Sequence, residues 1–188
     1  ISGPGIGAPV PLLGDVVVNA TTANTQQYAS VSAIDGGYVV TWSSYNQDGN
    51  GWGVYAQRYA SDGTPKGVET RVNTTTANHQ EYSSVSAIDG GYVVTWSSST
   101  QDGGRWGVYA QRYASDGTPQ GGETRVNTAT ANHQIYSSVS AIDGGGYVVT
   151  WSSSNQDGDG NGVYAQRYAS DGTPQGGETR VNATTANT

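Results

Sequence analysis

Short runs of apolar residues alternate with clusters of Gly, Asp, Asn and Pro along the whole chain. In the segment YVVTW at residues 38–42, the tyrosine, the second valine and the tryptophan lie on one side of an extended strand. The first valine and the threonine lie on the other side, because side chains alternate between the two faces of a strand. A strand that is apolar on both faces needs cover on both. The pattern therefore predicts stacked or radially arranged sheets.

The same pattern occurs three times. The motif VSAIDGGYVVTWSS begins at Val31 and Val85, and it returns at Val139 with one additional glycine, so the starts are 54 residues apart. Asp-Gly pairs between the apolar runs favour tight hairpins. In the first repeat the strand candidates are residues 28–34, 38–43, 54–60 and 68–73. Each repeat is therefore predicted to be a four-stranded antiparallel meander.

The repeats divide the chain into a short extension and one domain. Residues 1–15 form an N-terminal extension, and residues 16–188 form a single repeat domain. Within this domain we expect an extra strand at 16–19, repeats at about 20–73, 74–127 and 128–182, and a tail at 183–188. The extra strand is expected because DVVVNATTANT near the start matches RVNATTANT at the end. An additional copy at the opposite end is suited to pairing with a terminal sheet edge.

The predicted fold class is all-β, with three four-stranded antiparallel repeats arranged as β-propeller-like blades. Units of about 50 residues with four meandering strands are typical of blades. A threefold β-prism and a β-trefoil are the alternatives. Propellers usually have four or more blades, so three blades would be completed by a second chain. We therefore expect a homo-oligomer, specifically a dimer.

The composition excludes several functional classes. The 188 residues include no Cys, so a disulfide framework and a thiolate metal site are ruled out. A net charge of −7, with eight Lys plus Arg, argues against nucleic-acid partners. No apolar run approaches the roughly 18 residues of a membrane span, so we expect no membrane insertion. The chain begins at Ile1 and lacks Met, which indicates a processed start.

Most of the basic residues recur with the repeat. Arginines occupy two fixed positions in each unit, and a glutamate lies close to the second of them. We expect these residues to pair across neighbouring strands rather than to form a binding patch. The arginines are Arg58, Arg112, Arg167, Arg71, Arg125 and Arg180, and the glutamates are Glu69, Glu123 and Glu178.

The first candidate binding loop is polar, rich in Gly and present in every repeat, at residues 46–53, 100–107 and 155–162. Its tryptophans, Trp52 and Trp106, lie beside amides and carboxylates, a combination that can stack on a sugar and hold its hydroxyls. Asn161 replaces the tryptophan in the third copy. Packing against the blade edge is an alternative role for these rings. The candidate sugar ligands are Gln47, Asp48, Asn50, Trp52, Gln101, Asp102, Trp106, Gln156, Asp157 and Asn161.

The third copy of this loop also resembles a calcium loop. Asp157, Asp159 and Asn161 alternate as oxygen ligands do in such loops, although the downstream bidentate glutamate is missing. A turn that requires only Asp and Gly has the same appearance. No cofactor is required by the sequence, and calcium is an optional ligand.

The second candidate loop is the polar linker between repeats. It contributes Asn78, His79, Asn132 and His133 as further candidate sugar ligands. Polar linkers between repeats also arise without any binding role. Two histidines a full repeat apart are weak evidence for a metal or a general base.

The sequence contains no recognisable catalytic constellation. Its carboxylates are mostly turn aspartates and strand glutamates copied three times, whereas glycan cleavage needs a specialised acid pair. We therefore predict that the protein is not an enzyme.

The motifs DGGYVVTW, QDGNGWGVYAQRYASDGTP and GGETRVNT resemble a tandem repeat of large secreted bacterial proteins. The chain is also similar to small lectins of marine sponges. The resemblance spans about residues 16–188 and implies a secreted, extracellular protein. Together with the repeated loops, it predicts a multivalent lectin that binds glycans or glycoproteins, because repeated weak sites gain avidity. The alternative is a structural or adhesive extracellular repeat protein, stabilised by calcium and without a small-molecule ligand.

Overall fold

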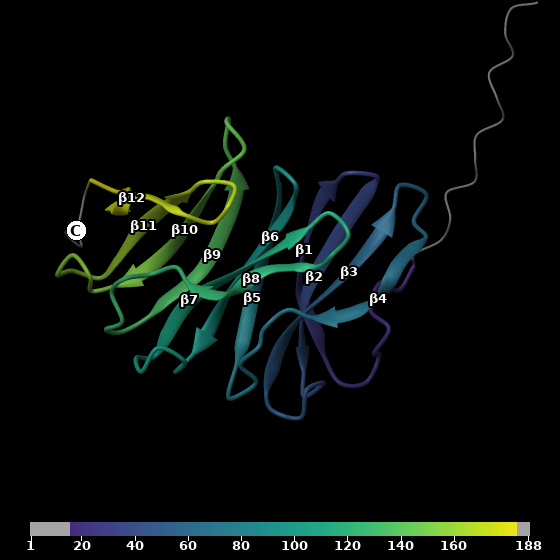
Figure 1. Ribbon diagram of the computed structural model, residues 1–188. Helices are drawn as coiled ribbons and strands as arrows, with labels where there is room; N and C mark the ends of the chain where they lie inside the picture. The colour runs from purple at the N-terminus through teal and green to yellow at the C-terminus, as the bar shows by residue number, and fades with distance from the viewer. Residues whose placement is uncertain (1–15, 184–188) are drawn as a thin grey trace, which may run out of the picture.

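The computed structural model describes residues 16–183, which form three four-stranded sheets in chain order (Figure 1). Within each sheet, neighbouring strands are antiparallel and follow the order of the sequence. The predicted all-β class and the three meanders are confirmed. The strands are β1 (Gln26–Ile34), β2 (Gly37–Tyr45), β3 (Trp52–Ala60), β4 (Pro65–Arg71), β5 (Gln80–Ile88), β6 (Gly91–Ser99), β7 (Trp106–Ala114), β8 (Pro119–Arg125), β9 (Gln134–Ala141), β10 (Tyr147–Ser154), β11 (Asn161–Tyr168) and β12 (Pro174–Arg180).

The outermost strand of each sheet begins earlier than the sequence suggested. In the first repeat β4 starts at Pro65, whereas the prediction placed this strand at residues 68–73. Proline lacks an N–H group, but it is tolerated as the first residue of an edge strand. Residues 1–15 and 184–188, which include the predicted extension and most of the predicted tail, lie outside the described residues. None of the described residues forms a helix long and apolar enough to cross a membrane.

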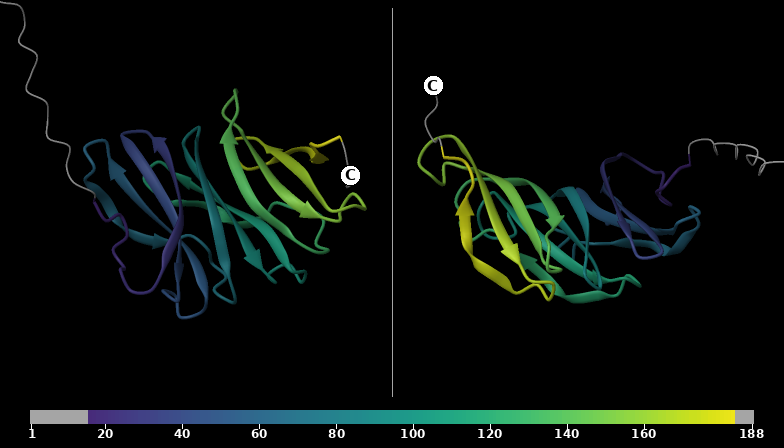
Figure 2. Two further views of the ribbon diagram at one scale, coloured as in Figure 1. Left: turned by 180° about the vertical axis from the view of Figure 1, so that it is seen from behind. Right: turned by 90° about the horizontal axis from the view of Figure 1, so that it is seen from above.

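The three sheets lie side by side as blades. The first strands, β1, β5 and β9, contact one another and therefore form the inner edge of the row. Views from behind and from above (Figure 2) show the blades fanning out in an arc, with β1–β4 and β9–β12 at opposite ends. This arrangement agrees with the expected propeller-like blades and differs from a closed threefold prism or trefoil.

The hydrophobic core lies at the two junctions between blades. In the middle blade, Val93 and Val94 are both 0% exposed although they are neighbours in the strand. Val94 belongs to the core shared with the first blade, and Val93 to the core shared with the third. This alternation is the arrangement that an apolar strand with two covered faces predicts.

The linkers between blades are held by a repeated polar clamp. The Thr74 backbone N–H donates to Glu123 Oε2 at 2.8 Å, and Thr128 N–H makes the same bond to Glu178. The predicted pairing of these glutamates with cross-strand arginines is wrong, because their carboxylates accept from the linker backbone. Arg58 Nη1 instead donates to the carbonyl oxygen of Ser115 in the next blade, at 2.9 Å. A linker that crosses between blades leaves backbone N–H groups unpaired, and the glutamates accept from them.

Residues 16–19, for which the sequence suggested an extra strand, are not part of a strand in the structure. They nevertheless occupy the position of an inter-blade linker. Asn19 Nδ2 donates to Gln26 Oε1 at 3.3 Å, as Asn73 Nδ2 does to Gln80 Oε1 at 3.2 Å, and Ala20 N–H donates to Glu69. No blade precedes this segment in the part of the chain that the structure describes, so the segment has no strand there to pair with.

Replacing Asn127 with Ala tests how much the corner asparagine stabilises a blade. Asn127 is 2% exposed and its Oδ1 accepts the Val108 N–H at 2.6 Å. Its loss leaves that buried N–H without a partner, so we expect the free energy of unfolding to fall by about 2 kcal/mol. Asn182→Ala is the matched control, because Asn182 Oδ1 makes the equivalent bond to Val163 in an exposed setting. Chemical denaturation should show a clearly smaller loss there, and equal losses would contradict the argument.

Candidate functional site

The two loops singled out in the sequence meet at one end of the blades. A Cβ added at Gly51, in the loop between β2 and β3, would lie 2.5 Å from the carbonyl oxygen of Asn78 in the following linker. At the next junction, Trp106 and His133 are joined by a parallel β-bridge. The loop of each blade therefore packs against the linker that enters the next blade.

The glutamines of the first loop are occupied by structural contacts. The amide groups of Gln47, Gln101 and Gln156 donate to the glutamates of the linker clamp. Ser98 Oγ also donates to Gln101 Oε1 at 2.7 Å, and the third blade has the same bond to Gln156. These side chains support the clamp, which leaves them poorly placed to hold a ligand.

The aspartates of the same loop shape its turn. Asp48 Oδ1 accepts the Asn50 N–H at 3.1 Å, and Asp102 Oδ1 accepts the Gly104 N–H at 3.0 Å. The side chain of Asp157 is 3% exposed, and its Oδ2 lies 3.7 Å from Arg180 Nη1. The described residues contain no group of three or more His, Cys, Asp or Glu arranged to hold a metal. Calcium binding by Asp157, Asp159 and Asn161 stays a prediction.

The two loop tryptophans are half-buried and face different partners. The Trp52 ring packs against Tyr45, with 5.2 Å between ring centroids. The Trp106 ring lies 6.3 Å from the ring of Tyr82 on the inner strand β5. Asn161, at the equivalent place in the third blade, is exposed. Of the two loop tryptophans, Trp106 is therefore the one whose ring lies near a tyrosine of an inner strand.

The candidate residues of the linker also have structural roles in the backbone conformation and its hydrogen bonds. Asn78 and Asn132 have φ angles of 64° and 63°, a left-handed conformation that asparagine tolerates. Asn78 Nδ2 donates to Thr100 Oγ1 at 2.8 Å. His79 and His133 are half-buried, and their carbonyl oxygens accept backbone N–H groups of β6 and β10 at 2.8 Å. These contacts account for the asparagines, whereas among the described residues Nδ1 of His79 is buried without a hydrogen-bond partner.

A row of three tyrosines on the inner strands was not recognised from the sequence. Tyr28, Tyr82 and Tyr136, which we call the tyrosine ladder, come from β1, β5 and β9. Their ring centroids are 4.7 and 4.8 Å apart. Tyr28 is 46% exposed and Tyr136 is 59% exposed, whereas Tyr82 between them is half-buried. The signal in the sequence was a tyrosine at the same place in QQY, QEY and QIY.

The ladder tyrosines adopt a backbone conformation that is unfavourable for their side chains. Their φ angles are 57°, 59° and 59°, which is the left-handed region that bulky residues avoid. In β1 and β5 the register to the neighbouring strand shifts at this position, so each ladder residue there forms a β-bulge. Bulges redirect side chains and concentrate beside functional sites. Strain repeated three times makes the ladder the strongest candidate site on the molecule.

Glu81 lies next to the ladder and has no counterpart in the other repeats. Its equivalents are Gln27 and Ile135. Glu81 is 8% exposed, and among the described residues no hydrogen-bond donor or basic side chain contacts its carboxyl group. Burial raises the pKa of Glu81, and burial followed by the nearby Glu81 carboxylate raises the pKa of Tyr82. A lone carboxylate with a raised pKa is a feature of functional sites.

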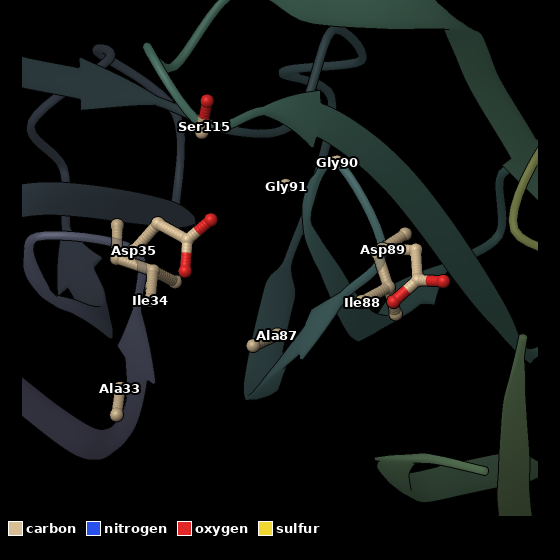
Figure 3. Close-up of a pocket in the computed structure, with 9 residues that line it drawn as sticks. All are labelled: Ala33, Ile34, Asp35, Ala87, Ile88, Asp89, Gly90, Gly91 and Ser115. Atoms are coloured by element: carbon tan, nitrogen blue, oxygen red, sulfur yellow. The ribbon is translucent and has the colours of Figure 1, made fainter. Parts of the chain in front are cut away.

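Small cavities open at the opposite end of the blades, between the hairpins. One of about 360 Å³ lies between the β1–β2 and β5–β6 hairpins (Figure 3). Asp35 projects toward this space, whereas Asp89 turns away from Asp35 in Figure 3. A Cβ at Gly145 would meet Asp89 Oδ2 at 2.1 Å, so Asp89 faces the third blade. These cavities contain no exposed aromatic ring, and we rank them below the tyrosine ladder.

No sequence model of a protein family matches the chain, and no curated protein sequence matches it. Solved structures do match its fold. An endo-arabinase from Bacteroides thetaiotaomicron is 17% identical, with a TM-score of 0.56 over 89% of this chain and 66% of that one. An α-L-arabinofuranosidase from Lactobacillus brevis is 15% identical, with a TM-score of 0.53 over 81% and 56%.

The structural neighbours are five-bladed β-propellers. This chain has propeller-like blades. It spans only about two thirds or less of their length. At these levels of identity, the likeness extends to the fold alone.

The prediction that the protein is not an enzyme is contradicted by these neighbours. The arabinase and the arabinofuranosidase are enzymes, as is an endo-1,4-β-xylanase from Bacteroides thetaiotaomicron that is 13% identical, with a TM-score of 0.51 over 85% of this chain and 62% of that one. The prediction rested on the absence of an acid pair that is not copied with the repeat. Glu81 is an unrepeated acid on an inner strand, and its burial could not be read from the sequence.

Replacing Glu81 with Gln tests the burial of this carboxyl group. A pKa that is raised by folding means that the folded protein holds the proton more tightly than the unfolded chain. Ionised Glu81 therefore costs stability above its folded pKa, and it costs nothing below the unfolded pKa of about 4.3. At pH 7 we expect Glu81→Gln to be more stable than the wild type by about 1 kcal/mol. Thermal unfolding at pH 7 and pH 3.5 checks this, and a gain that persists at pH 3.5 would contradict it.

Proposed function

We propose that the protein binds glycans along the tyrosine ladder, on the outside of the cell. The observation that carries this proposal is the contact between three strained tyrosines that project from adjacent inner strands. Aromatic rings bind the C–H faces of sugars, while nearby polar groups fix the hydroxyls. The ladder supplies both kinds of group, because its hydroxyls and the Glu81 carboxylate lie beside the rings.

The proposed site differs from the one suggested by the repeated loops. Those loops would give up to three separate sugar sites, whereas the ladder joins residues of three blades into one continuous surface. Trp106 lies 6.3 Å from Tyr82 and extends this surface toward the loops. We therefore infer that one oligosaccharide binds per chain, and that longer glycans bind more tightly than single sugars.

The variant Tyr28→Gly removes a ladder ring without imposing strain. Because Tyr28 has a φ of 57°, glycine fits its backbone better than tyrosine does, so we expect the free energy of unfolding to change by less than about 1 kcal/mol. Glycan affinity should fall by at least about tenfold, which corresponds to roughly 1.4 kcal/mol. A glycan array identifies the ligand, and calorimetry with that ligand measures affinity and stoichiometry, with and without a calcium chelator.

Tyr45→Ala is the matched control for Tyr28→Gly. Tyr45 is 44% exposed against 46% for Tyr28, but it packs on Trp52 in the loop region rather than in the ladder. Unchanged affinity in Tyr45→Ala supports the ladder. If Tyr45→Ala loses affinity and Tyr28→Gly does not, the binding site lies in the loops and not on the ladder. No binding to any glycan would favour the structural repeat protein.

A second candidate function is cleavage of the bound glycan, which the position of Glu81 favours. A general acid must hold its proton near the working pH, and burial raises the pKa of Glu81 in that direction. We expect any release of reducing ends from arabinan or xylan to fall by at least about 100-fold in Glu81→Gln. Binding of the same polysaccharide without release would leave the protein as a lectin.

A further inference from the structure

The third blade has an uncovered face that is buried in the other two. Val54 and Val108 are both 0% exposed at the junctions between blades, whereas the equivalent Val163 is 41% exposed. The same holds one strand further out, where Val126 is 4% exposed and its equivalent Val181 is 59% exposed. This face has the chemistry of a blade junction, but no blade covers it among residues 16–183.

The first blade has the complementary uncovered face. Val85 and Val139 are 6% and 7% exposed because each packs on the preceding blade, whereas the equivalent Val31 is 64% exposed. The face of the third blade and the face of the first blade are therefore the two halves of one interface. That interface occurs twice inside the chain, between the first and second blades and between the second and third.

Polar groups that form hydrogen bonds across the internal junctions also have equivalents on the two uncovered faces. Ser30 Oγ accepts the Val85 N–H at 3.3 Å, and Ser84 Oγ accepts the Val139 N–H at 3.2 Å. The equivalent serine of the third blade, Ser138, faces no further blade among the described residues. Arg112 Nη1 donates to the Ser170 carbonyl oxygen at 2.6 Å, and its equivalent, Arg167, is exposed.

We propose that two copies of this chain associate head to tail. The third blade of each copy packs on the first blade of the other, which closes a ring of six blades. In this ring Val163 packs on the partner's Val31, and Arg167 donates to the carbonyl oxygen of the partner's Ser61. We infer that a second copy covers each uncovered face, because at both internal junctions the same kind of face is covered by the next blade of this repeat. Burying the exposed valines supplies the driving force.

The closing junction differs from the internal ones in two ways. Ala29 stands where Ser83 and Ser137 donate hydroxyl hydrogen bonds to threonines of the preceding blade, at 3.1 Å. Residues 182–188 also repeat the sequence NATTANT of residues 19–25. At the closing junction, Asn182 of one copy and Asn19 of the other therefore both correspond to the position that Asn73 and Asn127 occupy at the internal junctions. The missing hydroxyl of Ala29 leaves one hydrogen bond fewer, which makes this junction weaker than the internal ones.

The variants Val31→Glu and Val163→Glu test the head-to-tail contact. Each places a charge on one half of the interface, at a side chain that is exposed in a single copy. By analytical ultracentrifugation we expect the wild type to have twice the mass of one chain, and each variant alone to be monomeric. An equimolar mixture of the two variants should recover dimers, because one junction in a mixed pair contains Val163 against Val31. An interface built from like faces would not give this pattern.

Val68→Glu is the matched control, because Val68 is 80% exposed on the outer strand β4, away from both open faces. It should remain dimeric. Circular dichroism establishes that each variant is folded, and Arg167→Ala provides a milder change that should weaken association several-fold. The proposal is overturned if the wild type is monomeric at every concentration, or if either glutamate variant still dimerises alone.

Discussion

The structure depends on one constraint, which is that the second strand of each repeat is apolar on both faces. Such a strand is stable only between two layers, and a single four-stranded sheet provides none. The chain satisfies this requirement by placing the blades in a row, so that Val93 and Val94 of one strand belong to two different cores. The glutamate clamp follows from the same arrangement, since each linker that crosses a junction exposes backbone N–H groups that need acceptors.

The candidate site is a product of that row. Stacking the blades places β1, β5 and β9 next to one another, and the bulge on each strand brings its tyrosine against the next. None of the rings would have this neighbour in an isolated repeat. The three repeats are nearly identical in sequence, but they are not equivalent in this surface. Glu81, beside the central ring, has Gln27 and Ile135 as its counterparts. A single ligand that spans three blades would therefore meet an amide, a carboxylate and an apolar side chain at this position.

Periodicity predicted most of the fold, because the strands and hairpins follow from alternation and Asp-Gly turns. It did not separate binding residues from structural ones. Gln47 and Asp48 look like sugar ligands in the sequence, and in the structure they hold a clamp and a turn. The reverse error concerned Tyr28, which reads as an ordinary strand residue. Its φ of 57° depends on a bulge, and a bulge arises from the pairing of two strands rather than from local composition.

The ends of the tyrosine ladder coincide with the two open faces of the row. Tyr28 and Tyr136 are its most exposed rings, and the blades that carry them are the ones that lack a neighbour. The inner strands of a propeller surround a central channel. Closing the ring would place Tyr136 of each copy beside the partner's Tyr28, as Tyr82 lies beside each of them now. Two separate ladders would then become a continuous belt of six rings around the channel. The same step that covers the exposed valines would therefore also change an open binding surface into an enclosed one, and it would couple ligand affinity to association through the ladder.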